Sequence, residues 1–113
     1  MRPPGLLSDG VRSALCDFRR RLVAIFGSRL KEVRLFGSRA RGDARVDSDA
    51  DVLVVLDEVG RTEFVAITDL CGDLLVAHDV LIDPYVVSAE RFAEHLRQER
   101  PLALQIERDG VPL

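Results

Sequence analysis

The sequence predicts a single α/β domain, and three observations support this fold class. Apolar residues recur at helical spacing over 11–26 and 62–76, and the β-rich runs 32–36 and 50–57 alternate with them. The chain has 113 residues, 47% of them hydrophobic, so one core can bury roughly two-thirds of the unfolded surface. No internal repeat or low-complexity linker divides the chain. We therefore expect one domain over 1–113.

The first half of the chain is expected to form a helix and two strands. The helix covers 11–26; Ser8 or Asp9 can cap its start, and Gly27 can end it. A short strand over 32–36 follows, and 38–43 can hold a helical turn before the second strand at 50–57. The second strand is apolar from Val52 to Leu56, which is typical of a central strand covered on both faces.

The second half continues the alternation. A helix is expected over 62–76, then a strand over 78–87, in which Pro84 indicates a sheet edge or a bulge. Ser88 can cap another helix, which is expected to run to about Glu99 and to be closed by Pro101. The tail over 103–113 predicts a short strand with a turn at Asp109-Gly110.

Composition and charge exclude several classes of protein. No run of about 18 apolar residues is present, and no signal peptide is recognised, so we expect a cytoplasmic protein. Cys16 and Cys71 lie in apolar helical patterns and are expected to be reduced core cysteines. The net charge of -3 argues against a general polynucleotide binder. Positive charge gathers in Arg39, Arg41 and Arg45, which suits a small polyphosphate or a solvated loop.

Two carboxylates stand at the start of the second strand. Asp49 and Asp51 are two residues apart, so in a strand they share one face and repel each other beside an apolar run. Such a pair suits magnesium, which is commonly held by one or two carboxylates and substrate phosphates. Asp79, at the start of the next expected strand, or Asp83 could supply a third carboxylate. His78 and His95 lack metal-ligand spacing and are expected to make surface or partner contacts.

Gly37 and Ser38 supply features that suit phosphate. A glycine directly after a strand lets backbone amides approach a ligand, and a helical turn starting at Ser38 would point free N–H groups at an anion. The Ser38 hydroxyl can also donate to a phosphate oxygen. Ser48, before the acidic pair, is expected to bond local backbone. Together with the acidic pair, these residues predict a site for a nucleoside triphosphate with magnesium.

The segment "GSRARGDARVDSDADVLVVLD", residues 37–57, resembles the minimal nucleotidyltransferase (MNT) family, within the superfamily that includes DNA polymerase beta. That superfamily carries Gly-Ser, a spacer of about ten residues, and acid-x-acid on a strand. The segments "HDVLIDPYVVSAERF" and "IERDGVPL" also resemble the family, so the resemblance covers nearly the whole chain. It implies a single compact nucleotidyltransferase domain with a mixed central sheet flanked by helices.

The resemblance also implies roles for individual residues. Ser38 would hold a terminal phosphate after Gly37, and Asp49 and Asp51 would bind two magnesium ions. Asp79 would be the third acid, adding a metal ligand and orienting or deprotonating the nucleophile. Arg39 and Arg41 would contact phosphate or remain solvated, and Asp83 stays a rival to Asp79.

Minimal members of the family are typically paired with a small helical HEPN toxin, to which they transfer AMP from ATP at a tyrosine. The resemblance therefore implies a magnesium-dependent protein adenylyltransferase that acts as an antitoxin. Two alternatives stay open: a non-catalytic nucleotide-binding module that masks its partner, and an enzyme that modifies a small molecule. Few residues follow Glu99, so a second protein is expected to complete the acceptor site. The nucleotide base and the oligomeric state stay open, although an edge at Pro84 could pair two copies.

Overall fold

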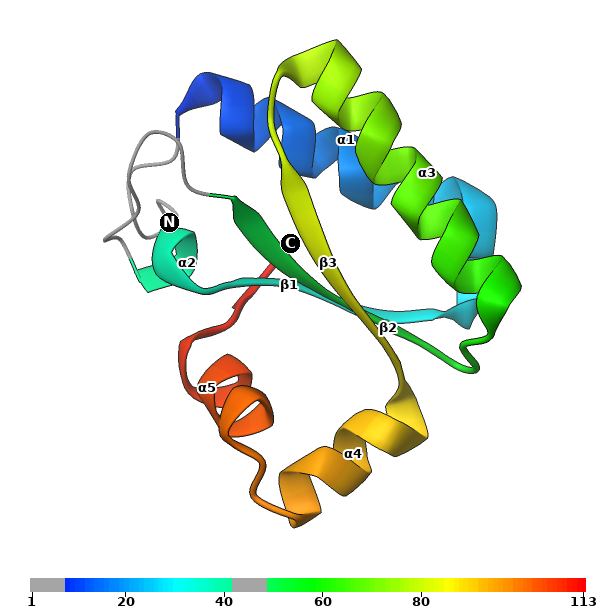
Figure 1. Ribbon diagram of the computed structural model, residues 1–113, viewed down its shortest axis with the longest axis vertical. Coiled ribbons are helices and arrows are strands. Elements are labelled where there is room, and N and C mark those ends of the chain that lie inside the picture. Colours follow the sequence, from blue (N-terminus) through cyan, green and yellow to red (C-terminus); the bar gives the residue numbers. More distant parts are fainter. Residues whose placement is uncertain (1–7, 42–48) are drawn as a thin grey trace.

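The computed structural model describes residues 8–41 and 49–113, so Arg45 and Ser48 lie outside the described residues. Figure 1 shows a sheet with helices on both of its faces. The first half of the chain forms α1 (Asp9–Phe26), a short 3-10 turn (Gly27–Arg29), β1 (Leu30–Phe36), α2 (Ser38–Arg41) and β2 (Ala50–Leu56). The second half forms α3 (Arg61–His78), β3 (Ile82–Ser88), α4 (Ala89–Arg97), α5 (Pro101–Asp109) and β4 (Val111–Pro112).

The four strands form a mixed sheet in the order β3-β2-β1-β4. β1 runs antiparallel to both β2 and β4, whereas β2 and β3 are parallel. The antiparallel pairing places the end of β1 beside the start of β2, and the parallel pairing places the start of β3 there too. The mixed sheet flanked by helices that the sequence predicted is confirmed.

Alternate residues of β2 enter two separate cores, which explains the continuous apolar run. Val52 and Val54 pack into a cluster with α1 and α3, which lie side by side over one face. Leu53 and Val55 pack with Phe92 of α4 and Ile106 of α5 over the other face. Because side chains alternate along a strand, Asp51 shares the α4–α5 face with Leu53.

Three helix boundaries are set by the residues that the sequence indicated. The Ser8 hydroxyl accepts a hydrogen bond from the Val11 N–H at 3.2 Å and caps α1. Gly27 ends α1 with a φ of 54°, a conformation that favours glycine. The Ser88 hydroxyl accepts from the Arg91 N–H at 3.1 Å and caps α4.

The expected strand over 78–87 begins too early. Helix α3 continues through His78, whose Nε2 lies 3.0 Å from Asp17 Oδ2 of α1. Asp79 then ends the helix in the left-handed conformation, and its N–H donates to the Leu75 carbonyl at 2.9 Å. Asp79 is therefore a helix-terminal residue and not the first residue of a strand, because tertiary contacts between helices extend α3 beyond its local pattern.

Strand β3 is an edge strand, as Pro84 predicted. The Ala50 N–H donates to the Leu81 carbonyl at 2.9 Å, so the backbone groups of Leu81 and Asp83 point toward β2. The backbone groups of Pro84 point to the outer edge, so the sheet keeps all of its hydrogen bonds although proline has no N–H. Proline also offers no donor to a further strand, which disfavours pairing of two copies along this edge.

The tail differs most from the expectation. Residues Pro101–Asp109 form helix α5, and only Val111–Pro112 form a strand, which pairs with β1. Pro101 occupies the first turn of α5, where its missing N–H costs nothing, so it opens this helix and does not close the preceding one. Ala103 and Ile106 bury one face of α5 against the sheet.

The two cysteines differ in burial. Cys71 is buried, as expected, but Cys16 is exposed on α1 and is not a core residue. Both are free thiols. No helix in the described part of the chain combines the length and apolarity needed to cross a membrane.

Candidate active site

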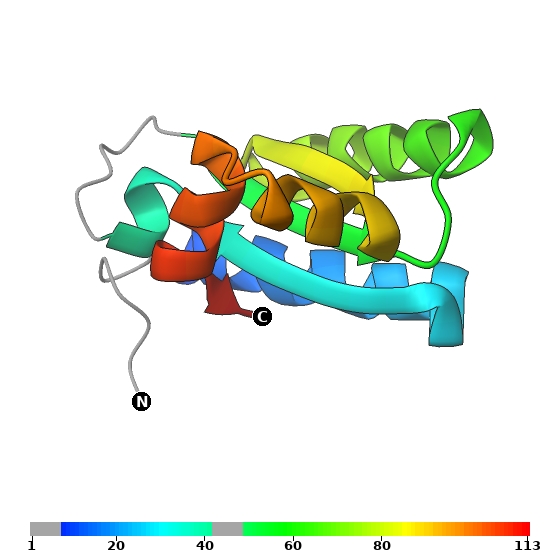
Figure 2. The ribbon, with the colours of Figure 1, turned by 90° about the horizontal axis from the view of Figure 1, so that it is seen from below.

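A pocket of about 610 Å³ lies at the end of the sheet where β1 stops and β2 and β3 start. In this region Phe36 of β1 pairs with Asp51 of β2, and Asp51 pairs with Asp83 of β3. The short helix α2 and helix α5 lie at the same end (Figures 1 and 2). The residues that line the pocket are Phe36, Gly37, Ser38, Arg41, Asp51, Asp83, Pro84, Tyr85, Leu102 and Gln105.

Gly37 is packed directly against the Asp51 carboxylate. Its φ is 76°, in the region that L side chains rarely adopt. A Cβ added here would lie 3.2 Å from Asp51 Cγ and under 3.0 Å from Oδ2. Both the backbone conformation and the missing side chain are therefore needed to bring the end of β1 against this carboxylate.

The Asp51 carboxylate is partly buried beside other carboxylates. Burial is the main reason that its pKa is raised, and the charges of Asp83 and Asp49 add to the effect. Arg41 acts in the opposite direction but does not outweigh them. A cation in the pocket would relieve this repulsion.

The residues of α2 divide between the pocket and the core. Ser38 and Arg41 line the pocket, and the Arg41 N–H donates to the Gly37 carbonyl at 3.1 Å. Arg39 points elsewhere: its side chain is only 9% exposed, and it does not line the pocket. Of the two arginines expected to contact phosphate or solvent, Arg41 alone faces the pocket.

The four acidic candidates are not equivalent in position. Asp51 and Asp83 line the pocket, on adjacent strands in register. Asp49 is exposed just before β2 and does not line the pocket, but its charge reaches Asp51. Asp79 is exposed at the end of α3 and is not a pocket residue.

Two carboxylates and open space for phosphate oxygens and water match the usual donor set of protein-bound magnesium. Within residues 8–41 and 49–113 no three His, Cys, Asp or Glu side chains converge on a point that could hold a metal ion. The residues therefore fit a metal that takes its remaining ligands from a bound phosphate, and they do not form a closed metal cage of their own.

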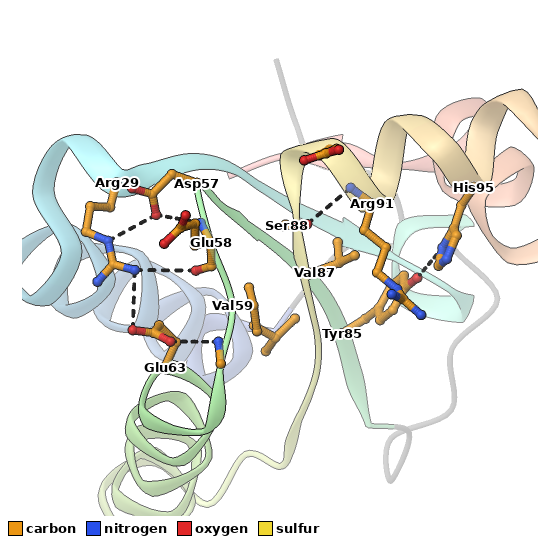
Figure 3. Close-up of a pocket in the computed structure, with 13 residues that line it drawn as sticks. Arg29, Asp57, Glu58, Val59, Glu63, Tyr85, Val87, Ser88, Arg91 and His95 are labelled. Carbon is orange, nitrogen blue, oxygen red and sulfur yellow. Dashed lines mark hydrogen bonds and ion pairs between the residues drawn. The ribbon is translucent and has the colours of Figure 1, made fainter.

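A larger cavity of about 900 Å³ lies toward the other end of β3, between the β2–α3 loop and α4 (Figure 3). Two of its four acidic residues are paired with Arg29, whose Nε donates to Asp57 at 3.0 Å and whose Nη2 donates to Glu63 at 3.3 Å. Tyr85 lines both cavities, and its hydroxyl lies 3.0 Å from Nδ1 of His95. Asp57 and Glu63 therefore have a cationic partner within the protein, whereas no hydrogen bond or ion pair of the Asp51 carboxylate is found within residues 8–41 and 49–113.

Sequence reasoning did not single out Tyr85, Leu102 and Gln105 as pocket residues. Tyr85 could have been found two residues after Asp83, on the same strand face. Leu102 and Gln105 are three residues apart and share a helix face, but that spacing has meaning only if the tail is a helix.

Comparisons with known proteins show the family to which the chain is similar. The model of the nucleotidyltransferase domain family matches residues 11–106. A protein of Methanocaldococcus jannaschii assigned as a protein adenylyltransferase is 39% identical over 79 residues, covering 70% of this chain and 75% of its own length. Protein adenylyltransferase MntA of Thermococcus cleftensis is 37% identical over 54 residues, covering 48% of this chain and 52% of its own.

Solved structures show the same fold. A structure assigned as a minimal nucleotidyltransferase aligns with a TM-score of 0.58 and 32% identity, covering 90% of this chain and 94% of the other. A toxin–antitoxin complex with AMP-PNP contains a chain that aligns with a TM-score of 0.54 and 23% identity, covering 85% and 69%. The family match spans most of the chain, including the pocket that Gly37 and Asp51 form. The chain belongs to the nucleotidyltransferase domain family and is a nucleotidyltransferase similar to protein adenylyltransferases of the MntA type.

Proposed function

We propose that this protein is a magnesium-dependent adenylyltransferase that moves AMP from ATP to a hydroxyl group of a protein acceptor. The observation that supports the proposal best is the position of the Asp51 carboxylate between Gly37 and Asp83, where burial and the neighbouring charges of Asp83 and Asp49 raise its pKa. A nucleotide with magnesium supplies the missing positive charge and phosphate oxygens together.

The pocket residues suggest two separate roles, phosphate binding and metal binding. Ser38 can donate its hydroxyl to a phosphate oxygen, and the cationic Arg41 can balance phosphate charge on the same side. Asp51, with Asp83 or Asp49, would hold magnesium, which when bound neutralises charge on the transferring and leaving phosphates. The missing Cβ of Gly37 keeps the phosphate end and the carboxylate end in contact.

The reaction is an exchange at the α-phosphate. The acceptor oxygen forms a bond to the α-phosphorus while the bond from that phosphorus to the bridging oxygen breaks. Pyrophosphate leaves with the bonding electron pair, and the acceptor hydroxyl gives up its proton. We assign Asp83 to orient this hydroxyl or to accept the proton, since Asp83 lies in register with Asp51 and lines the pocket, whereas Asp79 does not.

The protein acceptor is supported by the relatives. The similar protein of Methanocaldococcus jannaschii is assigned as a protein adenylyltransferase, and the Thermococcus cleftensis relative is named protein adenylyltransferase MntA. Structures with the same fold come from toxin–antitoxin complexes. These names support a protein acceptor and a toxin partner. The resemblance to minimal nucleotidyltransferases implies that this partner is a helical HEPN toxin, that the acceptor is one of its tyrosines, and that the chain acts as an antitoxin.

Label transfer tests this proposal. Purified protein is incubated with magnesium, α-labelled ATP and lysate of the source organism, and labelled proteins are separated on a denaturing gel. We expect a labelled band that disappears with Asp51→Asn, and mass spectrometry of the band identifies the acceptor. Label found only on small molecules would refute the protein acceptor. Protection from the toxin that survives an Asp49/Asp51 double substitution would show that the chain acts by masking.

A further inference from the structure

The residues that line the pocket are of two chemical kinds. Ser38, Arg41, Asp51 and Asp83 have a hydroxyl or a charge, which suits phosphate and a metal ion. Phe36, Pro84, Tyr85, Leu102 and Gln105 carry no charge. A nucleoside triphosphate has the same division, with a charged phosphate chain at one end and an uncharged aromatic base at the other.

Helix α5 supplies two unlike residues of the uncharged set, Leu102 and Gln105. Leu102 is 42% exposed although it lines a cavity, whereas Ala103 and Ile106 on the adjacent face are buried against the sheet. Gln105, one turn further along, is half-buried, and its amide makes no hydrogen bond to another residue within 8–41 and 49–113. These two side chains therefore offer the pocket an apolar surface and a donor–acceptor pair.

Tyr85 is the aromatic residue of the uncharged set on β3. It follows Asp83 by two residues on β3, so its ring lies on the same face as that carboxylate. Its hydroxyl lies 3.0 Å from Nδ1 of His95 in α4, as Figure 3 shows. The hydrogen bond restrains the ring and leaves its face as a rigid apolar surface at the edge of the pocket.

We propose that the uncharged lining residues of α5 and β3 form the subsite for the nucleotide base, and that Gln105 reads the base edge and favours adenine. The pocket volume of about 610 Å³ suits one small-molecule ligand. The Gln side chain offers one acceptor and one donor group, which match the N6 amino group and N7 of adenine. Guanine presents two acceptors, O6 and N7, at the corresponding edge, so one partner of the amide would be unmatched. This inference rests on the proposed nucleotide-binding function.

Nucleotide binding by matched variants tests the assignment. Dissociation constants of ATP, GTP and inorganic tripolyphosphate are measured with magnesium by calorimetry for the wild type and for Gln105→Ala, Leu102→Ala and Leu104→Ala. Leu104 is the control because it is 45% exposed on the same helix but does not line the pocket.

We expect Gln105→Ala to reduce the preference for ATP over GTP about tenfold. Leu102→Ala should weaken both nucleotides about fivefold by removing apolar contact with the base. Both variants should bind tripolyphosphate as the wild type does, and Leu104→Ala should change none of the three constants.

The failure of this inference can be distinguished from failure of the proposed function. An unchanged ATP-to-GTP ratio in Gln105→Ala, with ATP bound by the wild type, would overturn the base subsite alone. The same conclusion would follow if Gln105→Ala and Leu102→Ala changed only the KM of the acceptor in label transfer, because this face would then contact the acceptor. Absence of magnesium-dependent binding of both ATP and tripolyphosphate to the wild type would refute the proposed function itself.

Discussion

Substitution of Gly37 by alanine should reduce the transfer activity strongly and the stability of the fold only moderately. The new Cβ would come under 3.0 Å from Oδ2 of Asp51, and the residue would keep a φ of 76°. The left-handed backbone costs an L residue about 1–2 kcal/mol, which corresponds to a loss of about 5–10 °C in Tm for a domain of this size. The atom that must move is the end of a flexible carboxylate, so we expect the fold to survive.

The effect on activity should be larger than the effect on stability. A displacement of about 1 Å at a reacting group can reduce the rate about 100-fold. We therefore expect Gly37→Ala to lower the rate of label transfer about 100-fold while Tm falls by no more than about 10 °C. Circular dichroism measures Tm, and label transfer from α-labelled ATP measures activity.

Gly27 provides a matched control. It also has a positive φ, of 54°, but nothing lies within 4 Å of an added Cβ. Gly27→Ala should therefore lose stability and retain the wild-type transfer rate. Equal loss of activity in both variants, or transfer within twofold of wild type in Gly37→Ala, would refute the assigned contact between Gly37 and Asp51.

Three further predictions concern charge, thiol reactivity and helix capping. Burial raises the pKa of Asp51, so the folded state holds this proton more tightly than the unfolded chain, and stability falls as pH rises above the ordinary value of 3.8. Asp51→Asn should therefore raise Tm at pH 7 without magnesium and reduce transfer at least about 100-fold; a lower Tm would contradict this reasoning. Burial also raises the pKa of Cys71 to about 11, so iodoacetamide at pH 8 should label the exposed Cys16 and spare Cys71, and labelling of both in the native protein would contradict the packing. Ser88→Ala removes the hydroxyl that accepts from the Arg91 N–H and should cost about 1 kcal/mol in urea unfolding, whereas an unchanged midpoint would refute the cap.

Much of the fold could be predicted because the short-range patterns of the sequence agree with the burial and the helix ends found in the structure. The run from Val52 to Leu56 is apolar at every position, and both faces of β2 are buried as that pattern indicates. Ser8, Gly27 and Ser88 have side chains or backbone freedom suited to helix ends, and each stands at one. These residues act through neighbours within a few positions, so the sequence contains the necessary information.

The errors arose where distant contacts decide the structure. The segment after Leu74 is β-rich, but contacts between α3 and α1, including the pair His78 and Asp17, keep it helical. The tail around Ile106 is helical because one face of α5 packs against the sheet, and Pro101 can open a helix as well as close one. Local pattern cannot distinguish these alternatives.

The candidate site shows the same limit. Gly37, Ser38, Asp49 and Asp51 could be identified from their types and spacing, and all but Asp49 line the pocket. Asp79 and Asp83 could not be ranked from sequence, because the ranking depends on the residue at which β3 begins. The register of β3 with β2 places Asp83 beside Asp51.

The most direct test of the account compares Asp83→Asn with Asp79→Asn in magnesium-dependent label transfer from ATP. Asparagine tolerates the left-handed conformation of Asp79, where φ is 55°, so this substitution leaves the helix end intact and is a fair control. We expect Asp83→Asn to lower the transfer rate at least about 100-fold and Asp79→Asn to stay within about twofold of wild type. Loss of transfer in Asp79→Asn with near-normal transfer in Asp83→Asn would contradict it.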